Sequence, residues 1–107
     1  MSTPTILGDA KERATMLVVR DNAAMGRFEM TSGDAIAFVE YRRDGDRIVL
    51  THTEVPAALS GQGVGSRLVA GVLDRIRSEG AAVVAQCEFV AAFIRRHPGY
   101  RDLEAAG

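Results

Sequence analysis

The feature that most constrains the fold of this chain is a change in hydrophobic periodicity near residue 60. Before it, apolar and polar residues alternate in short segments, which is the two-residue period of half-buried strands. After it, apolar residues recur with the period of one helix face. The residues of this helical stripe are Val64, Leu68, Val69, Val72, Leu73 and Ile76. The chain is therefore expected to form a sheet first and then a helix that covers it.

The segment before the change is predicted to form four strands. Their ranges are residues 16–20, 26–30, 35–42 and 47–55. Short turns rich in Asp, Asn and Gly join them, the first at Asp21-Asn22, and such short connections favour an antiparallel meander. Pro56 ends the fourth strand, because proline has no N–H to donate to a sheet.

The segment after the change predicts two helices and one more strand. The first helix covers about residues 63–79, and an apolar run at residues 81–86 follows as a buried fifth strand, parallel to the fourth because a helix separates them. The second helix covers residues 88–97. Its inward residues are expected to be Phe89, Val90, Phe93 and Ile94. The order β-β-β-β-α-β-α predicts an α/β (α+β) fold class with a mixed, mostly antiparallel sheet.

Length and composition narrow the class of protein. The 107 residues fit one domain, expected over residues 13–107 after a loosely ordered terminus at residues 1–12. A formal net charge of −1 and the absence of Trp argue against a nucleic-acid binder. A single cysteine cannot form an internal disulfide. Without a membrane-length apolar run or a signal-peptide pattern, the expectation is a cytoplasmic protein with no membrane partner.

The run Gly61-Gln62-Gly63-Val64-Gly65-Ser66 lies between a predicted strand and the amphipathic helix. Glycine lets the backbone approach a ligand closely, and the first N–H groups of a helix have no internal partner. Together with the helix dipole they form an anion site suited to a pyrophosphate. A glycine-rich helix entry without a ligand is the alternative. The spacing fits neither a Walker nor a Rossmann motif.

This loop resembles the acyl-CoA loop of GCN5-related N-acetyltransferases, the GNAT superfamily. The family pattern is Arg or Gln, two residues, Gly, one residue, then Gly or Ala; Gly63 and Gly65 match, and Ser60 departs from the usual first residue. The resemblance is greater to a short, single-domain, YjdJ-like subgroup. The residues that carry it are Arg27-Phe28-Glu29, Ala37-Phe38-Val39-Glu40-Tyr41, Leu50-Thr51-His52-Thr53, the glycine loop, Cys87 with Phe89-Val90, and Arg96-His97-Pro98 with Tyr100.

The resemblance implies that acetyl-CoA, or coenzyme A, is the bound cofactor and acyl donor. The cofactor-binding residues that it implies are Val55, Gly61, Gln62, Gly63, Val64, Gly65 and Ser66. The acceptor would be an unidentified amine. Residues 21–25 are too short for the one or two helices that larger members have between their first two strands, so an open acceptor site is expected, suited to a protein or peptide.

Two function classes remain open at this point, and the oligomeric state is not predicted. One is an N-acetyltransferase. The other is a module that holds coenzyme A or acetyl-CoA without turnover, which the serine at Ser60 and the missing acceptor helices favour.

Cys87 lies at the predicted junction of the fifth strand and the second helix, where a helix N-terminus stabilises a thiolate. The resemblance implies that the strands flanking the glycine-loop helix diverge, with the acyl thioester between them, and that a cysteine here is the suspected catalytic group. Such a thiolate would accept the acetyl group covalently. The alternatives are a buried cysteine that only packs, or one that protonates the departing coenzyme A.

His52 lies on the fourth predicted strand, shortly before the loop. Simple alternation puts Ile48, Leu50, His52 and Glu54 on one side, although a bulge would break that pattern. His52 is a candidate base for the amine or for the thiol of Cys87, with Glu54 as an alternative base. The other interpretation of His52 is a strand histidine bonded to a neighbour. No metal is expected, because the His and Cys residues lack zinc-ligand spacing.

Overall fold

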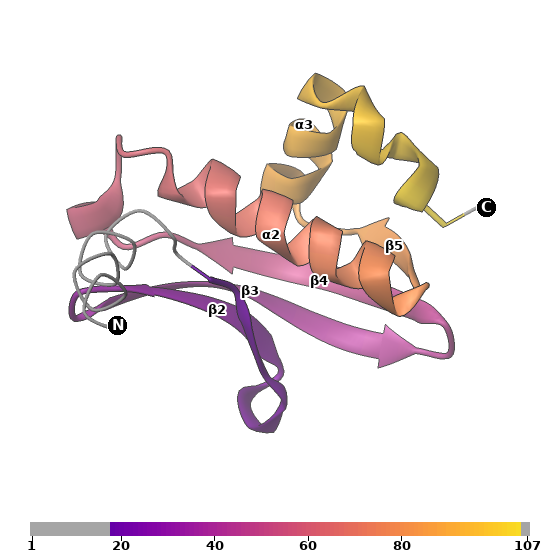
Figure 1. Ribbon diagram of the computed structural model, residues 1–107, viewed down its shortest axis with the longest axis horizontal. Helices are drawn as coiled ribbons and strands as arrows, with labels where there is room; N and C mark the ends of the chain where they lie inside the picture. The colour runs from indigo at the N-terminus through magenta and orange to yellow at the C-terminus, as the bar shows by residue number, and fades with distance from the viewer. Residues whose placement is uncertain (1–17, 106–107) are drawn as a thin grey trace, which may run out of the picture.

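A computed structural model describes residues 18–105 as a sheet with helices on one face (Figure 1). The five strands lie in the order β1-β2-β3-β4-β5. They are β1 (Arg20–Asn22), β2 (Arg27–Ser32), β3 (Ala35–Asp44), β4 (Arg47–Glu54) and β5 (Ala82–Ala85). The helices are α2 (Val64–Glu79) and α3 (Glu88–Arg96), with 3-10 turns η1 (Ala23–Met25), η2 (Ala57–Leu59) and η3 (Pro98–Leu103).

The strand pairing confirms the predicted mixed sheet. β1 to β4 form an antiparallel meander. β5 returns after α2 and pairs in parallel with β4, from Arg47 opposite Ala82 to Leu50 opposite Ala85. The predicted α/β (α+β) class and element order are therefore correct. No helix within residues 18–105 is both long and apolar enough to cross a membrane.

The first strand differs from its prediction. Part of the predicted strand, and all of the predicted terminus at residues 1–12, lie outside the described residues. Asp21 and Asn22 were expected to turn but belong to β1, and the turn follows at η1. Both side chains have partners on the sheet, because Asp21 accepts from the Tyr41 hydroxyl at 2.6 Å and the Asn22 amide donates to Glu29 at 2.9 Å.

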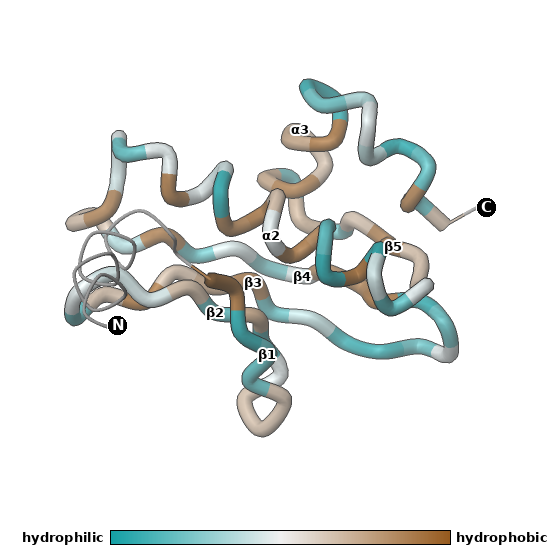
Figure 2. Tube along the Cα trace, in the orientation of Figure 1, coloured by the Kyte–Doolittle hydropathy of each residue, from teal (hydrophilic) through white to brown (hydrophobic). Residues whose placement is uncertain are grey.

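One core lies between α2, α3 and the sheet. The predicted stripe of α2 is buried throughout, and brown hydrophobic positions recur along its tube in Figure 2. Opposite it, the buried side chains of the strands include Phe28, Met30, Val39, Ile48 and Leu50. The inward face of each strand is thus fixed by contact with the helices.

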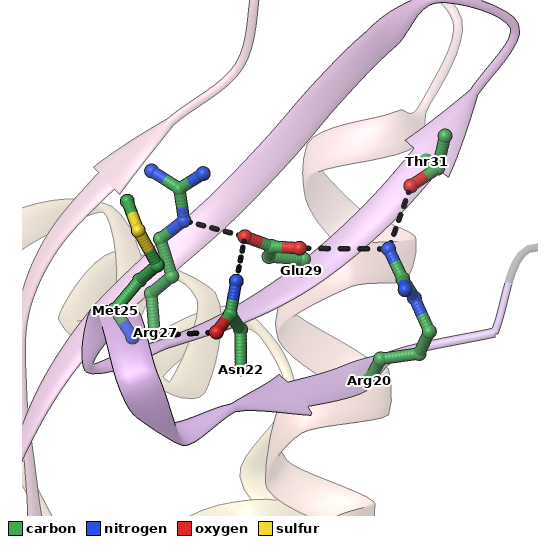
Figure 3. A network of polar contacts seen from close by, with 6 residues as sticks. All are labelled: Arg20, Asn22, Met25, Arg27, Glu29 and Thr31. Carbon is green, nitrogen blue, oxygen red and sulfur yellow. Dashed lines mark hydrogen bonds and ion pairs between the residues drawn. The ribbon is translucent and has the colours of Figure 1, made fainter.

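The other face of the sheet carries a buried carboxylate, Glu29, which is 4% exposed (Figure 3). It accepts hydrogen bonds from Arg27 Nε at 2.6 Å and from Asn22 Nδ2 at 2.9 Å, and Arg20 lies at 3.5 Å. The hydrogen bond from Arg27, and then that from Asn22, lower the pKa of the Glu29 carboxyl. Burial has the opposite effect but is the smaller contribution.

The Glu29 network predicts how stability depends on pH. A carboxylate with a lowered pKa stabilises the fold above the pKa of the unfolded chain, and this contribution is lost as the pH falls through the folded value. Glu29→Gln should therefore cost about 1.5–3 kcal/mol at neutral pH. The difference from wild type should shrink as the pH drops below the ordinary value of 4.5.

Urea unfolding at a series of pH values measures this difference. Glu79→Gln is the matched control, because Glu79 forms its ion pair with Arg43, at 3.2 Å, on the surface. This substitution should lower the free energy of unfolding by less than about 1 kcal/mol. A Glu29→Gln deficit that stays constant into acid would contradict the assignment.

Candidate active site

The glycine loop connects η2 to α2 in a backbone conformation that favours glycine. Gly61 and Gly63 have φ angles of 78° and 73°, in the left-handed region. Gly63 is the N-cap of α2 and has no side chain to bond the N–H groups of the first turn. These groups therefore remain available to an anion in front of the helix.

A pocket of about 280 Å³ opens at this helix start. Its lining residues are Val55, Leu59, Ser60, Gly61, Gly63, Val64, Gly65, Ser66 and Phe89. Every residue of the predicted cofactor set except Gln62 is among them. The Gln62 side chain instead donates to Ala58 O at 3.2 Å, and the backbone carbonyl of Gln62 accepts from the Arg67 guanidinium at 3.1 Å.

Phe89 was expected to point into the core, and that prediction is wrong. Its side chain is 43% exposed, and it lies against the start of α2. A Cβ at Gly65 would come within 2.7 Å of Phe89 Cζ and 3.4 Å of Val55 Cγ2. Gly65 therefore serves close packing of the aromatic ring, and Phe89 forms a wall of the pocket. Helical periodicity alone did not identify Phe89 as a site residue.

Beside this pocket, β4 and β5 diverge, as the family resemblance implies. Leu50 and Ala85 are the last residues paired between β4 and β5, and β4 continues to Glu54 with β3 as its partner but without β5. The carbonyl of Leu50 accepts from the N–H groups of both Gln86 and Cys87, at 3.0 and 3.1 Å. The chain turns away from the sheet here and enters α3, with Cys87 as the N-cap.

A bulge in β4 changes which residues face the helices. Glu40 lies opposite His52 while Tyr41 lies opposite Leu50, so Thr51 is an extra residue without a partner on β3. One extra residue moves every later side chain to the other face. The prediction that Ile48, Leu50, His52 and Glu54 share one side is therefore wrong beyond Leu50.

His52 and Glu54 lie together on the face opposite the helices. His52 Nε2 is 2.9 Å from a Glu54 carboxylate oxygen, and both side chains are about half exposed. The His52 ring also lies 6.4 Å, centroid to centroid, from Phe38. The expectation that these two residues share a face is confirmed.

Cys87 is half-buried and packs at the edge of the core. Its Sγ lies 3.2 Å from Thr53 Oγ1. Within the described part of the chain, Thr53 is the polar side chain bonded to this sulfur, whereas His52 is bonded to Glu54. The structure thus places the two predicted catalytic residues on opposite sides of β4, with Cys87 on the helix side and His52 on the open side. Simple alternation along the sequence could not predict that Thr53 contacts Cys87, because the bulge at Thr51 is what turns the Thr53 side chain to the helix side of β4.

A family model described as GCN5-related N-acetyl-transferase matches residues 27–103. The chain belongs to this family. The match covers β2 to η3 and so includes the glycine loop, the diverging strands and Cys87.

Two relatives illustrate the breadth of this similarity. Protein NATD1 of Bos taurus is 35% identical over 69 residues, which is 64% of this chain and 61% of NATD1. The match therefore spans less than two thirds of that relative. The NMR structure of a GCN5-like putative N-acetyltransferase from Staphylococcus aureus aligns with a TM-score of 0.65 and 26% identity. That alignment covers 85% of this chain and 90% of the other.

The contact between Gly65 and Phe89 predicts an energetic coupling. Gly65→Ala gains up to about 1 kcal/mol of helix propensity but forces the Phe89 ring to move. In a Phe89→Ala background the ring is absent, so Gly65→Ala should be more favourable there by about 0.5–1.5 kcal/mol. Chemical denaturation of the four proteins in this double-mutant cycle measures the difference. Additive effects would mean that the ring does not pack on Gly65.

Proposed function

We propose that this protein transfers an acetyl group from acetyl-CoA to an amine of an unidentified acceptor. The observation that carries the proposal is the pocket at the start of α2, adjoining the divergence of β4 and β5 in a chain of the GNAT family. The pocket suits the diphosphate of the donor. The divergence suits its thioester, because Cys87 and His52 both belong to the segments that border it.

Donor binding would depend on backbone groups more than on charge. No basic side chain is among the described residues that line the pocket. Arg67 is the nearest arginine in sequence, and its guanidinium is held by the Gln62 carbonyl. The N–H groups of residues 61–66 and the dipole of α2 would therefore hold the pyrophosphate. Val55 and Phe89 would provide the apolar wall beside it.

The chemistry that we propose has one step on each side of β4, with Cys87 acting on the helix side and His52 on the open side. The thiolate of Cys87 attacks the acetyl carbonyl, a new thioester forms, and coenzyme A leaves as its thiolate and takes up a proton. The acceptor amine then attacks the acetyl-cysteine and releases Cys87. His52, oriented by Glu54 at 2.9 Å, takes the proton of the amine. This assigns His52 to the acceptor rather than to the thiol.

The acceptor that we propose is an amine of a protein or peptide. His52 and Glu54 are exposed, and the face of the sheet that carries them has no helix over it within residues 18–105 (Figure 1). The connection from β1 to β2 is the single 3-10 turn η1. A site this open suits a large acceptor, which brings its own surface to exclude water from the thioester.

The donor site can be tested with a matched pair of glycine variants. Gly63 and Gly33 both have positive φ, and a methyl group added at either would meet open space, so Ala at either should cost a similar ~1–2 kcal/mol. Gly63→Ala places a methyl group at the loop and should weaken coenzyme A binding about tenfold or more. Gly33→Ala lies in the turn between β2 and β3 and should leave binding unchanged.

Isothermal titration of wild type and of the two folded variants with coenzyme A measures these affinities. Equal affinities in wild type and both variants would place the diphosphate elsewhere. Affinity lost equally in both folded variants would mean that the loop has no special role in binding, and the loop assignment would then fail as well.

The covalent route predicts an acetylated intermediate. Wild type incubated with acetyl-CoA and no acceptor should gain one acetyl group on Cys87, as measured by intact mass and peptide mapping. Cys87→Ser should lose transfer by at least about 10²-fold while still binding acetyl-CoA, because serine at this position lacks a nucleophile of similar strength.

The remaining outcomes separate the rival interpretations. Near-normal transfer by Cys87→Ser would support direct attack by the amine on acetyl-CoA. Binding of acetyl-CoA with neither an acetyl adduct nor release of coenzyme A across a panel of amines and peptides would favour the non-catalytic binding module.

A further inference from the structure

The fold places the hydroxyl of Thr53 against the thiol of Cys87. The two atoms are 3.2 Å apart although the residues are separated by 34 positions in the chain. Thr53 lies on the part of β4 that has no partner on β5, and Cys87 is the N-cap of α3. The contact therefore bridges the point at which the two strands diverge.

Two backbone features hold this pair in place. The bulge at Thr51 turns Thr53 toward the helices, where its partner across β3 is the buried Val39. The N–H of Cys87 donates to Leu50 O at 3.1 Å, which ties the start of α3 to the same strand. Both side chains are half-buried, so water competes only in part for the hydrogen bond.

The direction of this hydrogen bond depends on the protonation state of the sulfur. A thiol can donate to Thr53 or accept from it, but a thiolate has no proton and can only accept. The hydroxyl of Thr53 has one proton to donate. A hydrogen bond donated to the charged form of a group favours that form.

We infer that Thr53 is a positioning residue that stabilises the thiolate of Cys87 and fixes the direction of its sulfur. On ionisation the thiol proton passes to water or a buffer base, and Thr53 keeps its own proton while donating the hydrogen bond. This inference rests on the proposed role of Cys87 in acetyl transfer. It replaces His52, which lies on the other face, as the partner of the thiol.

Most of the charged side chains on the elements around the cysteine have other partners. These side chains are Glu88 in the first turn of α3, Arg95 and Arg96 in its last turn, His52 and Glu54 on β4, and Arg67 in the first turn of α2, while β5 carries none. Glu88 pairs with Arg95 at 2.7 Å, and His52 pairs with Glu54. Within residues 18–105, Thr53 is the side chain that hydrogen-bonds the sulfur.

The test is the rate at which iodoacetamide alkylates the folded protein across a range of pH. The chain has one cysteine, so every adduct reports on Cys87. Thr53→Val removes the hydroxyl and keeps the shape, and should slow alkylation about tenfold at neutral pH, the effect of one hydrogen bond to a charged group. At a pH that ionises any thiol, its rate should equal that of wild type.

Three further variants complete the experiment. Thr53→Ser keeps the hydroxyl and should retain the wild-type profile. Thr53→Ala is a second hydroxyl-free variant, should match Thr53→Val, and replaces it if the valine variant does not fold. Thr31→Val removes the exposed Thr31 hydroxyl on β2, which accepts from Arg20 at 3.1 Å. This control should leave the alkylation rate of Cys87 unchanged at every pH.

Other results would overturn the inference. Unchanged rates in both hydroxyl-free variants would mean that the hydrogen bond does not affect ionisation. If alkylation slows by the same factor at every pH, the substitution changes the access of iodoacetamide to the sulfur and not the ionisation of the thiol. Faster alkylation would mean that Thr53 stabilises the protonated thiol. Alkylation needs no acetyl-CoA, so a failed acetyl-transfer assay and a failed Thr53 assay are distinguished directly.

Discussion

The packing of α2 on the sheet is the constraint on which the rest of the structure depends. Its apolar stripe is almost completely buried against the strands, and each such side chain contributes about 1.5–3 kcal/mol. Val64 and Leu68 anchor the first turn of the helix, so the glycine loop in front of it ends at a fixed point. The same packing returns the chain beside β4, where β5 pairs in parallel. The pocket and the divergence of the strands are therefore consequences of one buried interface.

Within this frame, a single extra residue in β4 decides the arrangement of the reactive side chains. Thr51 lengthens the strand by one position relative to β3. Thr53 then faces the helices and contacts Cys87, while His52 and Glu54 face the open side of the sheet. We regard this separation as the basis for assigning the thiol to the acyl donor and the imidazole to the acceptor.

The open side of the sheet also has a support of its own. Arg27 donates to the buried Glu29, and its guanidinium carbon lies 4.2 Å from the centroid of the Phe38 ring. Phe38 in turn lies beside His52. A buried carboxylate with charged partners is costly to disturb, and this chain of contacts links it to the surface next to His52.

The sequence by itself determined the class of fold, the order of the elements and the glycine loop, because periodicity and turn residues act over short distances along the chain. The sequence pattern also placed Cys87 at a strand-to-helix junction, and a resemblance to a known family implied its catalytic role. Only the tertiary structure decided the faces of the side chains beyond Leu50 and the outward position of Phe89. Both depend on contacts between distant segments: the register of β4 against β3, and the packing of an α3 residue on a glycine of α2. The sequence pattern of one strand cannot show that it contains a bulge, because a residue is extra only relative to the strand that it pairs with.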